Sequence, residues 1–144
     1  MTSPDEMPRF VDWSRAFVPP ASALDYLSQQ LSVTDVVLLL NLITPPLIEV
    51  EGCVLFKDRY FPKTFADWST HLDHSPQALE RVINQVNLWD VFEPTDPAEE
   101  DALSSVATAL SHIWPDHAHR SFPDMTFKSE ITDSYGPGVT LFRA

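Results

Sequence analysis

Three histidines and an aspartate fall within eight positions in the last third of the chain. They are His112, Asp116, His117 and His119. Imidazole and carboxylate groups bind zinc and iron(II), and a catalytic metal site needs three such ligands plus an open position. The spacing matches no established signature, because Pro115 disturbs a helix between His112 and His117. We therefore favour helix-end histidines that interact with the helix dipole, and predict no metal and no other cofactor.

A second candidate for chemistry combines Asp67 and His71, which lie four positions apart. On a helix, the carboxylate could orient the imidazole as half of an acid–base site. No motif marks a nucleophile, although Ser69 and Ser75 are close. A surface ion pair followed by the loop residue His74 is the simpler interpretation.

The single cysteine, Cys53, allows neither an internal disulfide nor a cysteine-based zinc site. It lies in an apolar segment, which indicates a buried thiol rather than a reactive one. The only basic cluster, Lys57 to Lys63, contains Tyr60 and Phe61 and could contact single-stranded nucleic acid. Three cations are too few in a chain with a net charge of -12, so we predict no nucleic-acid binding.

Acidic residues are concentrated in one interval. No Lys or Arg occurs between Arg81 and Arg120, and six acids fall within positions 90–101. One interpretation is a docking surface for a basic protein, anchored by neighbouring aromatic residues. The other is a solvated connector whose last acids stabilise a helix start. The candidate partner-binding residues are Trp89, Asp90, Phe92, Glu93, Asp96, Glu99, Glu100 and Asp101.

Length and composition limit the fold and the classes of site to which these residues can belong. The chain has 144 residues, of which 44% are hydrophobic, enough for a single domain with a sizeable core. Three glycines cannot supply a dinucleotide fingerprint or a phosphate-binding loop. No secretory signal, membrane-spanning segment or lipidation motif is present, so we expect a cytoplasmic protein without a membrane partner.

Start signals predict several helices. Ser22 with Asp25 forms a capping pair for the first. Ser75-Pro76 starts a second, which carries an apolar stripe from Leu79 to Trp89. Asp96-Pro97 starts a third, which Pro115 kinks or ends. Residues 32–44 suit either a helix or a strand, and we favour the helix. Residues 1–20 are expected to form an irregular arm packed on the body, and residues 21–144 a single domain.

Two segments predict strands. Residues 47–50 and 53–56 flank Glu51-Gly52, which suits a tight hairpin turn. Residues 125–132 alternate apolar and polar side chains, and residues 139–142 are expected to pair back on them. The expected fold is α+β, with a small, mainly antiparallel sheet of two hairpins packed against four to five helices.

The absence of a catalytic signature favours a non-enzymatic binding module. An acidic inhibitor or immunity protein that neutralises a basic toxin fits the size and charge. A small metal-dependent enzyme using the 112–119 cluster is one alternative. An adaptor or chaperone subunit, docking through the apolar arm at 10–18 or a C-terminal strand edge, is the other. The oligomeric state stays open.

Overall fold

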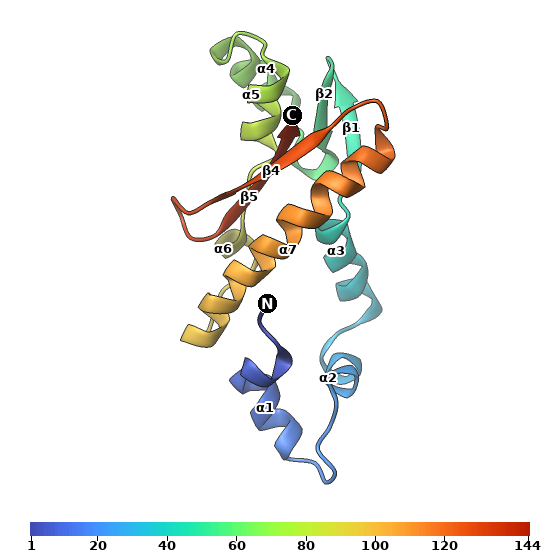
Figure 1. Ribbon diagram of the computed structural model, residues 1–144, viewed down its shortest axis with the longest axis vertical. Helices are drawn as coiled ribbons and strands as arrows, with labels where there is room; N and C mark the ends of the chain where they lie inside the picture. Colours follow the sequence, from blue (N-terminus) through green and yellow to red (C-terminus); the bar gives the residue numbers. More distant parts are fainter.

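The computed structural model describes all 144 residues as an α+β fold with two small antiparallel sheets (Figure 1). This confirms the expected fold class, with seven α-helices in place of the four to five expected. Single-turn 3-10 helices lie at Pro4–Glu6 and Lys57–Arg59. The helices are α1 (Pro8–Arg15), α2 (Ala23–Gln30), α3 (Val33–Ile43), α4 (Pro62–His71), α5 (Pro76–Ile83), α6 (Leu88–Val91) and α7 (Pro97–Ser121). The strands are β1 (Leu47–Val50), β2 (Cys53–Phe56), β3 (Val86–Asn87), β4 (Phe127–Thr132) and β5 (Gly138–Arg143).

Both expected hairpins form, but they belong to separate sheets. Strands β1 and β2 pair with Val50 opposite Cys53, and the intervening Glu51 and Gly52 adopt φ values of 49° and 82°. Such left-handed values at both turn positions match the right-handed twist of the flanking strands. The second sheet has the order β3-β5-β4, with β5 in the centre.

The long helix α7 packs against both sheets and supplies the centre of the core. Its residues Leu103, Ala107, Leu110, Trp114 and Ala118 are buried together with side chains of β2, β4 and β5. The indole of Trp114 meets the Phe56 ring edge-on at 4.8 Å, and its Nε1 donates to the Leu42 carbonyl at 3.0 Å. The helix continues through Pro115 to Ser121 instead of ending there. Complete burial of Trp114 and Ala118 on either side of the proline favours this continuation.

Two fully buried polar side chains, one in α5 and one at its C-cap, join the two sheets. Glu80 accepts hydrogen bonds from the Val54 backbone N–H of β2 at 2.8 Å and from the Arg143 backbone N–H of β5 at 3.1 Å. The Arg143 guanidinium also donates to Glu80 from Nε at 2.7 Å and from Nη2 at 3.0 Å. This hydrogen bonding to Glu80 raises the pKa of Arg143 above its ordinary value.

One turn along α5, Asn84 completes the same connection. Its Oδ1 accepts from the Phe56 N–H at 2.9 Å, and its Nδ2 donates to the carbonyls of Val54 and Leu141, both at 3.0 Å. The backbone groups on the free edge of β2 are thus satisfied by side chains rather than by a further strand.

The prediction of one helical apolar stripe from Leu79 to Trp89 is wrong beyond Ile83. The helix ends there, Val86 joins strand β3 opposite Val139, and Trp89 belongs to α6. Pairing with the edge of β5 offers these residues backbone hydrogen bonds that a longer helix would forgo. The start signals at Ser22, Ser75 and Asp96 are confirmed as N-caps, each accepting a bond from a backbone N–H.

The first twenty residues are not the irregular arm that was expected, because α1 occupies residues 8–15. Its Trp13 packs edge-on against Tyr26 of α2 at 5.1 Å, and Phe10 also meets Tyr26, at 5.7 Å. Figure 1 shows α1 and α2 projecting beyond the end of α7, with α3 leading back to the body. The ambiguous segment is therefore a helix, whose N-cap Ser32 and Asp35 form a capping box. No single helix combines the length and hydropathy needed to cross a membrane.

We predict that Glu80→Ala lowers the free energy of unfolding by about 3 kcal/mol, because two backbone N–H groups and a guanidinium lose their acceptor. Urea denaturation followed by tryptophan fluorescence measures the change. Glu130→Ala is the control, since Glu130 pairs with Arg81 at the surface and its loss should cost less than about 1 kcal/mol. Equal destabilisation by the two substitutions would contradict the bridging role of Glu80.

A second prediction concerns the loss of two helix caps at low pH. The backbone hydrogen bonds from Ser22 and Ser32 lower the pKa of Asp25 and Asp35 below the ordinary value of 3.8. Because the pKa is depressed in the folded state, these caps stabilise the helix starts above pH 3.8 and lose that effect as pH falls through the folded pKa. The protection of the Ser22 and Ser32 amides against hydrogen exchange, relative to an unstructured peptide at the same pH, should fall in that range. Asp25→Asn should remove the pH dependence at Ser22 and leave it at Ser32, whereas an unchanged Ser22 profile would contradict the capping assignment.

Candidate protein-binding site

The short helix α6 places one side chain in the core and the next on the surface. Leu88 is fully buried, and its backbone N–H donates to the Pro137 carbonyl at 2.9 Å. Trp89 is 42% exposed and lies over Gly136 in the turn between β4 and β5. A Cβ at position 136 would come within 2.6 Å of the indole, and the φ of Gly136 is +64°, so glycine is required there.

A cleft of about 490 Å³ opens beside Trp89. The ring of Tyr135 lies 5.9 Å from the ring of Trp89 at 68°, and Tyr135 is 56% exposed. None of the three carboxylates in the cleft forms an ion pair. The site therefore combines uncompensated negative charge with two accessible aromatic rings. The lining residues are Trp89, Asp90, Val91, Glu93, Pro94, Glu100 and Tyr135.

Two other acids of the same interval hold the start of α7. Asp96 accepts from the Glu99 backbone N–H at 2.8 Å, which makes it the N-cap. The Glu99 carboxylate accepts from the Thr95 N–H at 2.8 Å and lies 3.6 Å from Nε of Arg9. These two side chains are engaged in local structure, as the connector interpretation expected for helix-start acids.

Four of the eight candidate residues thus come together: Trp89, Asp90, Glu93 and Glu100. Phe92 lines a different, apolar groove, and Asp101 is exposed on α7 outside the cleft. Tyr135 was missed, although an aromatic residue in the turn-rich segment 133–138 was a usable signal. Its position beside α6 depends on the pairing of β3 with β5, which the sequence does not reveal.

The four residues of the histidine cluster lie along one continuous helix and do not converge. Five residues of helix separate His112 from His117 by about 140° around the axis. His117 Nε2 lies 2.7 Å from the Pro45 carbonyl oxygen, and His119 Nδ1 lies 2.8 Å from that of Met125. No group of three His, Cys, Asp or Glu side chains is placed to hold a metal ion. His117 and His119 thus tie α7 to neighbouring backbone.

The residues proposed for acid–base chemistry form a different contact. Asp67 and His71 make no ion pair, and the His71 ring lies 5.6 Å from that of Trp68. Instead, His74 Nδ1 lies 2.6 Å from Oγ of the buried Ser69, and the His74 N–H donates to the Ser69 carbonyl at 2.8 Å. Both contacts close the turn between α4 and α5.

Cys53 is buried, with 1% of the residue exposed, as the apolar surroundings indicated. Burial raises the pKa of this thiol, with Glu80 adding a smaller effect in the same direction. Both effects keep the thiol protonated and unreactive at neutral pH.

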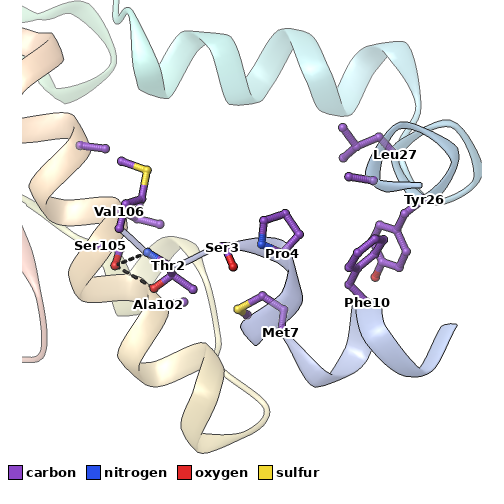
Figure 2. A pocket seen from close by; sticks show the side chains of 13 residues that line it. Thr2, Ser3, Pro4, Met7, Phe10, Tyr26, Leu27, Ala102, Ser105 and Val106 are labelled. Atoms are coloured by element: carbon purple, nitrogen blue, oxygen red, sulfur yellow. Dashed lines mark hydrogen bonds between the residues drawn. The ribbon is translucent and has the colours of Figure 1, made fainter. Parts of the chain in front are cut away.

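Two apolar grooves flank α7 on the side of the N-terminal helices. One, of about 650 Å³, lies between α3, residues 91–94 and α7. The other, of about 460 Å³, lies between the N-terminus, α2 and α7. Figure 2 shows Thr2 attached to Ser105 of α7, with Phe10 and Tyr26 at the far end of this second groove. The N-terminal helices are therefore held to α7 with apolar side chains left accessible between them.

Comparisons of the chain with protein-family models, with curated proteins and with solved structures gave no match.

Proposed function

We propose that this chain is a non-enzymatic binding module that holds a basic segment of a partner protein. One observation carries the proposal: Asp90, Glu93 and Glu100 share a cleft with the exposed rings of Trp89 and Tyr135, and no cation of the chain pairs with them. A Lys or Arg side chain entering this cleft would find both of the groups that bind cations in proteins.

The chemistry of the cleft suits a guanidinium or ammonium group. Carboxylates accept charge-assisted hydrogen bonds, and guanidinium can engage one with two bonds. Aromatic faces attract cations by about 0.5–1 kcal/mol at exposed sites. The net charge of -12 would also speed the approach of a basic surface.

An inhibitor or immunity protein that blocks a basic toxin is the more specific form of this proposal. A toxin that acts on nucleic acid presents cations arranged for phosphates, and the carboxylates at positions 90, 93 and 100 would occupy those cations instead. Trp89 would supply an aromatic anchor of the kind that dominates binding energy at interfaces.

We predict that neutralising the cleft weakens binding of a labelled oligoarginine peptide by about 10-fold, since three exposed pairs are each worth about 0.2–1 kcal/mol. The variant is Asp90→Asn with Glu93→Gln and Glu100→Gln, and fluorescence anisotropy measures the affinity. The matched control removes three exposed acids elsewhere, as Asp12→Asn with Asp67→Asn and Asp124→Asn. An equal loss in the control would show that only the bulk charge attracts the peptide, and would overturn the proposal.

A separate prediction tests the aromatic part of the cleft. Tyr135→Leu removes the ring without changing charge, so affinity for the same peptide should fall about threefold while its dependence on salt stays as in the wild type. Because the ring is largely solvent-exposed, stability should change by less than about 0.5 kcal/mol. Unchanged affinity would show that the ring takes no part in binding.

A further inference from the structure

Helix α3 carries a regular apolar stripe that packs against neither core cluster of the chain. Its last residues, Leu42 and Ile43, pack against the main core cluster. The outward stripe belongs to neither core cluster and lies in none of the grooves described above. It consists of Val33, Val36, Val37 and Leu40, which are 82%, 41%, 58% and 53% exposed. These positions follow the spacing i, i+3, i+4, i+7 of a helix seam made to pack on another helix.

The exposed apolar area is larger than a monomer ordinarily carries. Nine Leu and Val side chains between residues 24 and 40 are each at least 36% exposed. Together they expose several hundred Å², at or above the roughly 300–600 Å² of the largest patch on a typical monomer. They are spread over α2 and several faces of α3, and the stripe of Val33, Val36, Val37 and Leu40 contributes part of this area.

The same segment is almost free of charge. From residue 16 to residue 48 the only charged side chains are Asp25 and Asp35. Both carboxylates already accept bonds from the backbone, from Ser22 at 2.8 Å and from Ser32 at 2.9 Å. The stripe therefore offers nothing for an oppositely charged partner to pair with, and nothing that repels an identical surface.

We propose that the stripe of α3 packs against the same stripe of a second copy of this chain. A symmetric dimer needs a patch that is complementary to itself, and an uncharged seam at helical spacing meets that requirement. With the two helices antiparallel, Val33 of one copy meets Leu40 of the other, and Val36 meets Val37. Two molecules of net charge -12 repel each other over most of their surfaces, and this uncharged face is where they approach at the lowest electrostatic cost.

Other occupants fit the face less well. The bent pair of α2 and α3 passes a test of length and hydropathy for a broken membrane span. Helices that lie on membranes, however, carry Lys and Arg beside their apolar face, and none occurs between residues 16 and 56. An unrelated protein could present an apolar helix, but the second copy supplies one of matching length and spacing at the concentration of the chain itself.

Sedimentation equilibrium of the full-length protein tests the proposal. The wild type should have about twice the 16.3 kDa mass of one chain. Val37→Glu should be monomeric, with the dimer dissociation constant raised at least about 100-fold, because the interface would bury an unpaired charge. The control Ile131→Glu makes the same exchange at a 48%-exposed position of β4 and should remain dimeric. A monomeric wild type, or a Val37→Glu variant that stays dimeric, overturns the proposal.

Cross-linking supplies a second readout that does not depend on destabilising the interface. Val37→Cys lies at the centre of the stripe, near the expected two-fold axis, and should form an intermolecular disulfide on mild oxidation. Cys53 is buried and should not react, so Ile131→Cys serves as the control that remains uncross-linked. Failure of the Val37→Cys variant to cross-link contradicts the proposal. Flotation of the wild type with phosphatidylcholine vesicles, in place of dimer formation, would likewise overturn it and assign the face to lipid.

Discussion

The connection between the two sheets depends on one carboxylate of α5 and one amide at its C-cap. Glu80 and Asn84 lie one helical turn apart, fully buried, and together they bind backbone groups of β2 and β5. Neither sheet could close the core alone, since one has two strands and the other three. The side chains of α5 thus substitute for the strand that would otherwise link the sheets, and α7 packs across the joined surface.

Some acidic side chains stabilise the fold, whereas others remain unpaired at the surface. Glu80 neutralises Arg143 inside the fold, and Asp25, Asp35 and Asp96 cap helices. The carboxylates of Asp90, Glu93 and Glu100, between α6 and the first turn of α7, form no ion pair within the chain. Carboxylates left together and unpaired near exposed rings raise the local field without stabilising the fold, and this arrangement is what the proposed binding role rests on.

The elements governed by local chemistry were predictable from the sequence. Capping serines, proline at the first helical position and the Glu51-Gly52 turn act through neighbouring residues, and each is where the sequence indicated. The break after Ile83 was not predictable, because the partner of Val86 is Val139, more than fifty residues away. For the same reason four of the seven residues that line the cleft were foreseen, from a short stretch of sequence, whereas Tyr135 was not.

The exposure of the apolar stripe of α3 is a second feature that could not be predicted from the sequence. A helix that is apolar around most of its circumference is ordinarily buried, and the sequence alone could not show that this one projects from the body. The residues of the stripe, Val33, Val36, Val37 and Leu40, are not among those that line the acidic cleft beside α6. A dimer formed through the stripe would therefore not use the residues that line either acidic cleft. Two clefts on one particle would bind a partner with repeated basic segments more tightly than one cleft, by raising the effective concentration of the second contact.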